Sequence, residues 1–357
     1  MKMATVVGAR PQFIKAAPVS RVLRQTHQEI LIHTGQHYDP NMSEIFFAEL
    51  HIPRPDYNLG VGSGRHGEQT GAILKAVEEV LIQERPDALL VYGDTNSTLA
   101  GALAAAKLHI PVIHIEAGLR SFNRSMPEEI NRVLADHISS LLLCPTTAAV
   151  QNLAQEGITA GVYRNGDVMY DAFLYNRELS RTHSTVLKRV GLKPKAYFLC
   201  TIHRAENTDE PARLKEILTA LGQIQVPILL PLHPRTHKTI REQRLEGLIG
   251  SRVRILDPVG YLDMIALEAG AAKILTDSGG VQKEAYFAEV PCITLREETE
   301  WTETVATGWN RLAGAKAESI LQALHEAEPQ AQHPGIFGQG DAAEAFVRIL
   351  DAWARNG

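Results

Sequence analysis

The chain has 357 residues, of which 45% are hydrophobic and 22% charged, and its net charge is −5 at pH 7. These values are typical of a globular protein with room for two domains, and they provide no general electrostatic reason to bind nucleic acid or an anionic membrane surface. The sequence lacks a signal peptide and an apolar segment long enough to cross a bilayer, so we expect a cytoplasmic protein without a membrane partner. Its three cysteines lack metal-ligand spacing and are expected to be buried free thiols.

Short apolar segments alternate with amphipathic helical patterns from one end of the chain to the other. The predicted strands are Ala4–Val7, Ile30–His33, Ala88–Tyr92, Val112–Ile115, Leu141–Cys144, Tyr197–Thr201, Ile228–Leu232, Val253–Leu256, Lys273–Thr276 and Cys292–Leu295. This alternation predicts right-handed βαβ units and parallel sheets in the α/β class. Ten strands are many for one sheet, and the alternation is weakest around the polar, basic segment 179–195. We therefore expect two Rossmann-like domains, 1–168 and 169–340, with a ligand cleft between them.

The first strand leads into a glycine turn and a helix that begins with cations. Arg10 and Lys15 lie in the first turns of this helix. Cations at a helix N-terminus oppose the helix dipole, which suggests that an anion offsets them there. The alternative is that both side chains are solvated surface charges.

Three acidic residues follow predicted strands or begin the helix after one. Asp94 follows Ala88–Tyr92, Glu116 ends the next strand, and Glu128 stands in the first turn of a helix after Pro127. Neighbouring carboxylates raise one another's pKa, so three that converge at one sheet edge suit general acid/base catalysis. The alternatives are a helix cap for Asp94 and an i,i+4 ion pair between Glu128 and Arg132.

In the second half, His-Arg pairs follow two neighbouring strands. His203 precedes Arg204, and His233 is followed two residues later by Arg235. No spacing typical of zinc ligands is present, and each histidine has an arginine beside it, so phosphate is the better interpretation.

A strand-to-helix turn at 276–285 supplies a second phosphate-binding feature. Ser278, Gly279 and Gly280 leave backbone N–H groups unpaired at a helix N-terminus, where the helix dipole also attracts anions. Glu284 lies one turn later, where a carboxylate can accept a hydrogen bond from a sugar hydroxyl. A nucleophilic serine is disfavoured, because Thr276 occupies the position of the glycine that a nucleophile elbow needs.

A G-x-G-x-x-G pattern at 62–67 does not predict a dinucleotide site. No strong strand precedes it, and no acidic residue ends a following strand at the expected distance. The sequence therefore predicts neither a nicotinamide cofactor nor a metal.

Taken together, these motifs resemble those of the non-hydrolysing UDP-N-acetylglucosamine 2-epimerases. The matching segments are 8–15 (GARPQFIK), 34–38 (TGQHY), 93–97 (GDTNS), 114–120 (HIEAGLR), 127–132 (PEEINR), 203–207 (HRAEN), 277–284 (DSGGVQKE) and 296–301. Many short motifs in one order, spread over nearly the whole chain, make the resemblance specific.

The resemblance implies two domains in the GT-B fold, with the last helix, Asp341–Arg355, crossing back to the first domain. It implies a homodimer, no cofactor and a role in polysaccharide biosynthesis. The residues that it assigns to catalysis are Asp94, Glu116, Glu128 and His203. The residues that it assigns to UDP or sugar binding are Arg10, Lys15, Arg132, His203, Ser278, Gly279, Gly280, Glu284 and Arg311. Gln36 and His37 match an activating second substrate site of some members, although the loop 60–67 departs from the basic pattern of those members.

The expected reaction interconverts UDP-N-acetylglucosamine and UDP-N-acetylmannosamine by anti elimination of UDP to 2-acetamidoglucal, followed by re-addition. The family also has a branch that epimerises UDP-2,3-diacetamido-2,3-dideoxy-glucuronic acid, which the sequence leaves open. A GT-B glycosyltransferase and a non-catalytic nucleotide-sugar sensor are further alternatives; the sensor would have no use for three carboxylates.

Overall fold

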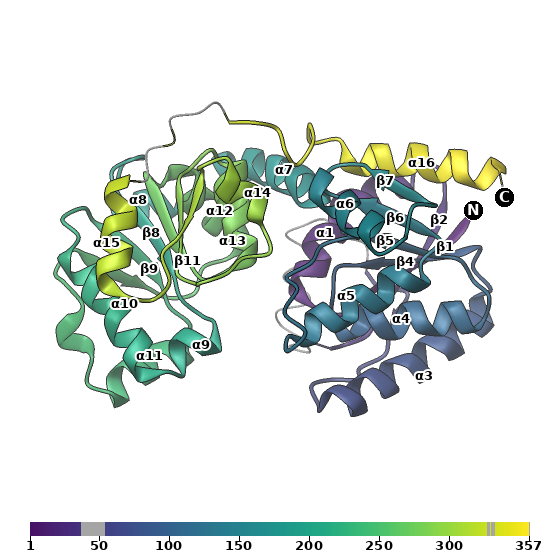
Figure 1. The fold of residues 1–357 in the computed structure, drawn as a ribbon, viewed down its shortest axis with the longest axis horizontal. Helices are drawn as coiled ribbons and strands as arrows, with labels where there is room; N and C mark the ends of the chain where they lie inside the picture. Colours follow the sequence, from purple (N-terminus) through teal and green to yellow (C-terminus); the bar gives the residue numbers. More distant parts are fainter. Residues whose placement is uncertain (37–53, 327–328, 330–332, 357) are drawn as a thin grey trace. The chain divides into compact units, whose positions relative to one another are not determined.

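Parallel strands and helices alternate along the chain in the computed structural model, which describes residues 1–36, 54–326, 329 and 333–356. Two structural units result. Unit 1 comprises Met1–Ala172 and Gly335–Gly357, and unit 2 comprises Phe173–Pro334. Helix α7 (Val168–His183) carries the chain from unit 1 into unit 2 (Figure 1). The predicted α/β class with two parallel sheets is confirmed.

Unit 1 is built on a seven-stranded parallel sheet in the order β3-β2-β1-β4-β5-β6-β7. Its strands are β1 (Lys2–Val7), β2 (Gln28–His33), β3 (Tyr57–Asn58), β4 (Ala88–Tyr92), β5 (Val112–Ile115), β6 (Leu141–Cys144) and β7 (Val162–Arg164). Its other helices are α1 (Arg10–Leu23), α3 (His66–Glu84), α4 (Asn96–Lys107), α5 (Pro127–Ile138), α6 (Thr147–Gln155) and α16 (Ala342–Asn356). The strand order reverses between β1 and β4, and ligands of such sheets bind where the strands next to this point end.

The period-2 pattern of the strands explains the core of unit 1. Val6, Ile32 and Val91 alternate to one face of the sheet, where they pack with Ile73 and Val77 of α3 and with the alanines of α4. Small residues on α4 let this helix lie close to the strands. A single layer of buried aliphatic groups thus fixes β1, β4 and β5, whose C-terminal ends carry the predicted site residues.

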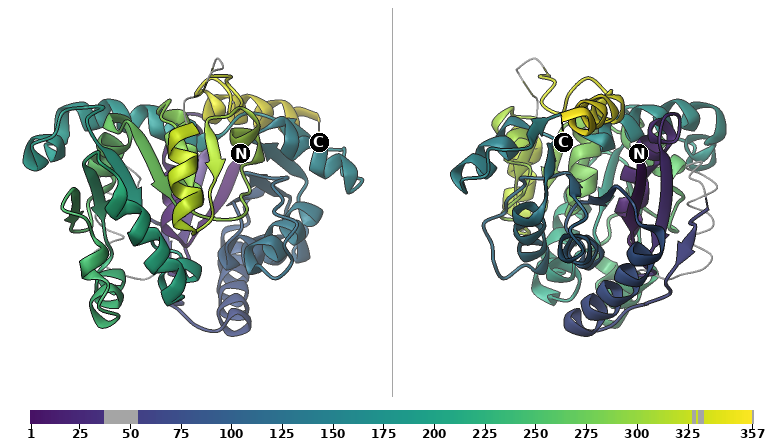
Figure 2. Two further views of the ribbon diagram at one scale, coloured as in Figure 1. Left: turned by 60° about the vertical axis from the view of Figure 1, so that its left-hand side comes forward. Right: turned by 90° about the vertical axis from the view of Figure 1, so that its right-hand side faces the viewer.

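Helix α16 belongs to unit 1, as the resemblance implied, and runs beside α1 (Figure 2). Phe346 and Leu350 are fully buried on its inner face. At its N-terminus, the carboxylate of Asp171 accepts hydrogen bonds from the N–H groups of Ala342 (3.1 Å) and Ala343 (2.7 Å). Towards its other end, Asp351 pairs with His27 at 3.1 Å. Both ends of the helix are therefore fixed to unit 1 by polar contacts.

Unit 2 repeats the architecture with a six-stranded parallel sheet in the order β10-β9-β8-β11-β12-β13. Its strands are β8 (Phe198–Thr201), β9 (Ile228–Pro231), β10 (Val253–Leu256), β11 (Lys273–Thr276), β12 (Cys292–Thr294) and β13 (Asn310–Leu312). Its helices are α8 (Val186–Val190), α9 (Ala205–Thr208), α10 (Pro211–Gln223), α11 (Pro234–Glu242), α12 (Tyr261–Gly270), α13 (Gly279–Phe287), α14 (Thr302–Ala306) and α15 (Ala317–Glu326), with a short 3₁₀ turn at Glu246–Leu248. One apolar layer lies under α10 and α15, and a second lies under α8, α12 and α13.

All ten predicted strands are present, and Cys144, Cys200 and Cys292 are buried free thiols as expected. The order reverses between β8 and β11, so the turns that follow these two strands are adjacent. No helix within the described residues is long and apolar enough to cross a membrane.

Candidate functional site

In unit 1, three loops meet where β1 and β4 end. A Cβ atom at Gly8 would lie 2.2 Å from Ser97 Oγ and 2.3 Å from Thr34 Oγ1, so only glycine permits this approach. Gln12 then joins the loops: its Oε1 accepts hydrogen bonds from the N–H groups of Gly8 and Ala9, and its Nε2 donates to the Tyr92 carbonyl at 2.9 Å. The first residues of α1 are thus held against the end of β4.

Lys15 and Glu116 form a buried ion pair at this edge. Lys15 lies on α1, Glu116 follows β5, and the side chains are 10% and 7% exposed. A Cβ at Gly93 would lie 3.0 Å from Lys15 Nζ and 3.2 Å from Glu116 Oε2, so the glycine makes room for the pair. Glu116 has a φ of +72°, a strained value for a non-glycine residue and one that is typical of functional sites.

Asp94 lies beside this pair and is bound by Arg132. The guanidinium of Arg132, on α5, contacts the Asp94 carboxylate and donates to Glu129 Oε2 at 2.8 Å. Asn131 donates to the Asp94 carbonyl at 3.0 Å. The structure therefore brings Lys15, Asp94, Glu116 and Arg132 together, as two carboxylates each held by a cation.

Glu128 is exposed at the start of α5 and forms no hydrogen bond or ion pair within the described residues. The alternative ion pair between Glu128 and Arg132 is thus absent, because Arg132 pairs with Asp94 and Glu129 instead. Glu129 also accepts from the N–H groups of Ser121 and Phe122, each at 2.9 Å. Burial raises the pKa of Glu129, but these hydrogen bonds and Arg132 outweigh it, and the net shift is downward.

Sequence reasoning missed a buried network behind these carboxylates. His114, on β5, contacts Asp136 through Nδ1 at 2.7 Å and the Gly93 carbonyl through Nε2 at 2.8 Å. Both partners are acceptors, so both contacts are hydrogen bonds only when the ring carries two protons. Arg120 also donates to Asp136, at 2.7 Å. Burial raises the pKa of Asp136, but His114 and Arg120 lower it further than burial raises it. The network fixes the turn that carries Asp94.

Gln36, His37 and Arg10 are the remaining predicted site residues of unit 1. Gln36 Oε1 accepts from the N–H (3.1 Å) and the hydroxyl (2.6 Å) of Ser97, at the start of α4. His37 lies outside the described residues. Arg10 begins α1, and its side chain lies outside the described part.

In unit 2, a buried carboxylate organises the turn that carries His203. Asp277 is fully buried after β11 and accepts hydrogen bonds from the N–H groups of His203 and Arg204, each at 3.1 Å. It also contacts His203 Nδ1 at 3.1 Å, while the His203 side chain is 53% exposed. Burial raises the pKa of Asp277, but its hydrogen bonds with His203, Arg204 and Asn207 give a net lowering. Asp277 therefore orients the ring and leaves Nε2 available.

Two of the three donors predicted at the turn 278–280 are free, and the third, the N–H of Ser278, donates to Thr276 Oγ1 at 3.0 Å. The Ser278 hydroxyl caps α13 by accepting from Val281 N at 3.3 Å. The N–H groups of Gly279 and Gly280 have no acceptor among the described residues. Because they begin a nine-residue helix next to the end of β8, they offer an anion site beside His203.

Glu284 is held by two groups that sequence reasoning missed. Tyr261 donates to Glu284 Oε1 at 2.9 Å. Glu268, on α12, is fully buried, contacts the Glu284 carboxyl, and has no other donor among the described residues. Burial raises the pKa of Glu268 well above its usual range, and the charge of Glu284 adds to the effect. Both effects favour the protonated form of Glu268, and a protonated carboxyl group can donate a hydrogen bond to the Glu284 carboxylate.

Arg311, a predicted ligand, and Arg296, to which no role was assigned from the sequence, lie in different surroundings. Arg311, in the edge strand β13, pairs at 3.0 Å with Glu326, the last residue of α15. Among the described hydrogen bonds and ion pairs, none joins Arg311 to another predicted ligand. Arg296 instead follows β12, is 3% exposed, and contacts Glu300 at 3.2 Å. Glu300 lies next to Gly279, where an added Cβ would be 2.3 Å from its Oε1. The usable signal was an arginine directly after a buried strand.

Within the described residues, no group of three or more histidine, cysteine or acidic side chains is arranged to hold a metal ion. The assembled groups are carboxylates paired with cations in unit 1, and an imidazole, backbone donors and a carboxylate in unit 2. Such groups can transfer protons and bind phosphate and sugar hydroxyls.

The family model for UDP-N-acetylglucosamine 2-epimerase matches residues 21–351. The chain belongs to this family. It is 53% identical to a UDP-N-acetylglucosamine 2-epimerase homolog of Methanococcus maripaludis, over 98% of this chain and 99% of that protein. It is 49% identical to the UDP-2,3-diacetamido-2,3-dideoxy-D-glucuronate 2-epimerase of Pseudomonas aeruginosa, with the same coverage.

A solved structure extends the comparison to the fold. The chain matches the crystal structure of Methanocaldococcus jannaschii UDP-GlcNAc 2-epimerase in complex with UDP-GlcNAc and UDP with a TM-score of 0.89 and 46% identity. The match covers 99% of this chain and 100% of that one. This family member is thus an epimerase with a GT-B-like fold, and the predicted resemblance is confirmed.

Proposed function

We propose that this epimerase interconverts UDP-N-acetylglucosamine and UDP-N-acetylmannosamine. The observation that carries the proposal is the cluster at the ends of β4 and β5, where Asp94 and Glu116 are each paired with a buried cation. Two carboxylates near each other can act as the base and the acid of a two-step proton transfer, and the relative that was crystallised with UDP-GlcNAc supports the choice of substrate.

The substrate's chemistry favours elimination. The C2 proton of an N-acetylhexosamine has no adjacent carbonyl and is not acidic, so it is removed as UDP leaves C1. The product of this step is 2-acetamidoglucal. Protonation of C2 on the other face and re-addition of UDP then give the epimer. Asp94, Glu116 and Glu128 are the proposed proton-transfer groups.

UDP must stay bound while the glycal exists. We assign its phosphates to His203, to the N–H groups of Gly279 and Gly280, and to the cations Arg10 and Lys15. We assign a sugar hydroxyl to Glu284. We add Arg296 to this set because it is buried and pairs with Glu300, which lies next to Gly279. We assign Arg132 to holding Asp94.

The proposal is tested by epimerisation in D₂O. The proton leaves one face of C2 and returns to the other, so we expect deuterium at C2 of the product by NMR. The substitutions Asp94→Asn and Glu116→Gln should each slow the reaction by ~10²–10⁴-fold, because an amide cannot transfer the proton. Glu79→Gln, an exposed residue of α3, is the control. Full C2 protium in the product would refute the mechanism.

A second substrate is favoured by one specific observation, the 49% identity to the diacetamido-glucuronate epimerase. Parallel NMR time courses with UDP-N-acetylglucosamine and with UDP-2,3-diacetamido-2,3-dideoxy-glucuronic acid decide between the two, since only the true substrate should be epimerised rapidly. A GT-B glycosyltransferase would leave both sugars unchanged in the absence of an acceptor, as would a sensor.

We further propose a cytoplasmic homodimer that supplies an amino sugar for polysaccharide biosynthesis, on the basis of the family resemblance. One surface of unit 1 supports the dimer. Ile130 and Leu134 lie one turn apart on α5 and remain 48% and 46% exposed. Pairing with a second copy would remove this apolar stripe from water.

A further inference from the structure

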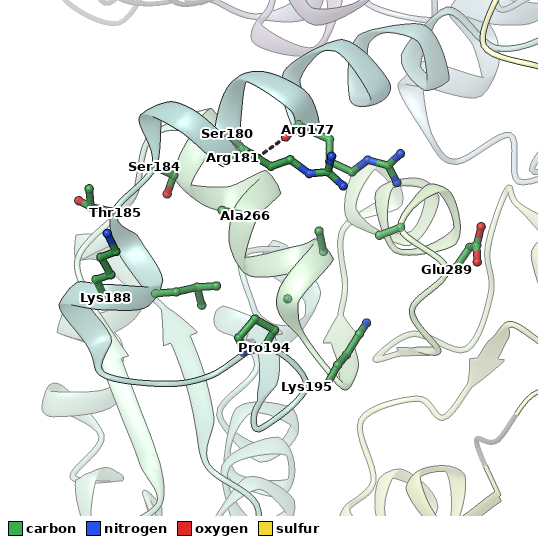
Figure 3. Close-up of a pocket in the computed structure, with 14 residues that line it drawn as sticks. Arg177, Ser180, Arg181, Ser184, Thr185, Lys188, Pro194, Lys195, Ala266 and Glu289 are labelled. Carbon is green, nitrogen blue, oxygen red and sulfur yellow. Dashed lines mark hydrogen bonds between the residues drawn. The ribbon is translucent and has the colours of Figure 1, made fainter.

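A cavity of about 580 Å³ lies within unit 2, away from the residues considered so far (Figure 3). Lys195 precedes β8 and Glu289 follows α13, so the cavity opens at the edge of the sheet where β8 and β12 begin. His203 and Ser278 follow the opposite ends of β8 and β11. The volume is in the range of small-molecule sites.

The charged side chains around this cavity are mostly cations. Arg177 and Arg181 come from α7, Lys188 from α8 and Lys195 from the turn before β8, and Glu289 is the one carboxylate among the lining residues. In Figure 3, both arginines and Lys195 extend towards the open space. The chain as a whole is negative, so this local excess of cations is opposite to its average charge.

These cations are poorly compensated within the protein. Only Arg181 forms an ion pair within the described residues, an exposed one with Glu178 at 2.9 Å. The Lys195 ammonium donates to the Ala271 carbonyl at 2.9 Å, and the Arg177 guanidinium lies 5.7 Å from the Phe173 ring centre. Burial lowers the pKa of Lys195, and the charge of Glu289 opposes that shift. Arg181, Lys188 and Lys195 are exposed to solvent, and a bound anion would replace the water around them.

The rest of the lining is partly polar and partly apolar. Ser180, Ser184 and Thr185 supply hydroxyl groups, and the apolar residues are Leu187, Pro194, Ala266, Ala269, Gly270 and Ala288. Small side chains on α12 leave a surface that a planar, uncharged group can contact, while the cations stand around it. The backbone also departs from its usual conformations here: Lys195 and Glu289 have φ values of +61° and +54°, where glycine would be unstrained.

We propose that this cavity binds a small molecule that carries a di- or triphosphate group, with a planar part such as a nucleobase against the alanine surface. Arginine and lysine from separate elements suit phosphate oxygens, which accept several charge-assisted hydrogen bonds at once. The site is distinct from the proposed UDP site, and it stands on its own residues whatever substrate the enzyme uses.

Calorimetric titration of the full chain tests the proposal, with inorganic pyrophosphate and ATP as probes and saturating UDP in the cell. The cavity variant Arg177→Gln/Lys188→Gln should weaken binding of both probes at least tenfold. His203→Ala should leave the cavity's affinity for pyrophosphate unchanged. Lys215→Gln/Lys316→Gln, which removes two exposed cations elsewhere in unit 2, is the charge-matched control. Thermal melting checks that each variant folds.

A measurement on the unsubstituted protein complements the variants. Pyrophosphate should protect Lys188 and Lys195 from acetylation, as read by mass spectrometry, while Lys215 and Lys316 stay reactive. The proposal is overturned if the cavity variant binds the probes as tightly as the parent protein, or if the control variant loses as much affinity as the cavity variant. It is also overturned if pyrophosphate does not protect Lys188 and Lys195 from acetylation. If ATP binds no more tightly than pyrophosphate, the planar part of the proposal is wrong.

Discussion

Asp277 and Glu268 show why the sequence indicated some site residues but not the buried residues that lie against them. Both carboxylates are fully buried, and each lies against a residue that we propose as a substrate ligand, Asp277 against His203 and Glu268 against Glu284. The sequence indicated His203 and Glu284 because they follow strand ends or begin helices. Their supporting groups come from elements 74 and 16 residues away along the chain, and only packing brings them close.

Glu268 gives a prediction in which stability and affinity move in opposite directions. Glu268→Leu removes a buried acid, so the free energy of unfolding should hold or rise. It also removes a donor to Glu284, and UDP affinity should fall about tenfold, since a hydrogen bond to a charged group contributes ~1.5–3 kcal/mol. Glu268→Gln keeps a donor and should restore affinity. Calorimetry with UDP checks both; equal affinity in the Leu variant would mean that Glu268 only fills space.

His33 predicts how the stability of unit 1 depends on pH. Burial lowers its pKa from 6.5 to about 4, so the folded ring stays neutral where the unfolded ring takes up a proton. The contribution of His33 to the free energy of unfolding is therefore full above pH 6.5. It falls by up to about 3 kcal/mol as the pH drops towards 4. We expect His33→Leu to lack this loss when hydrogen exchange of β1 and β2 amides is compared from pH 8 to pH 4. Parallel pH profiles of the parent protein and the His33→Leu variant would contradict this prediction.

At the scale of elements, the strands that the sequence predicted lie between two neighbouring strands, except β10, which is an edge strand of four residues. Three short strands, β3, β7 and β13, were not predicted. Each has two or three residues and lies at a sheet edge, so it carries too few apolar positions for a period to be read. Because β13 was not predicted, the pairing of Arg311 with Glu326 could not be anticipated. Arg296, which pairs with Glu300, was given no role from the sequence.

The attachment of α16 gives a prediction at this scale. Asp171 accepts from the first N–H groups of the helix and acts as a cap supplied by α7. Asp171→Ala should cost ~1 kcal/mol and speed amide exchange in the first turns of α16. Asp171→Asn retains an acceptor and serves as the matched control. If exchange in α16 is equally slow in the Ala variant, the cap does not hold the helix.

At the scale of the whole molecule, the apolar stripe on α5 tests the homodimer. Ile130→Lys/Leu134→Lys places two charges on this surface and should convert a dimer into a monomer in light scattering, without a change in circular dichroism. Ile255→Lys, which alters an exposed apolar residue of unit 2, should leave the dimer intact. A monomeric parent protein, or a dimer in the double variant, would refute the assignment.

The membership of α16 in unit 1 also has a consequence for biosynthesis. Residues of unit 1 lie on both sides of unit 2 in the sequence, so the ribosome finishes unit 2 before it makes α16. During that interval the surface that later buries Phe346 and Leu350 stays open to water or to chaperones. Unit 2 can thus complete its core while translation continues, whereas unit 1 reaches its final form only after the last helix has emerged.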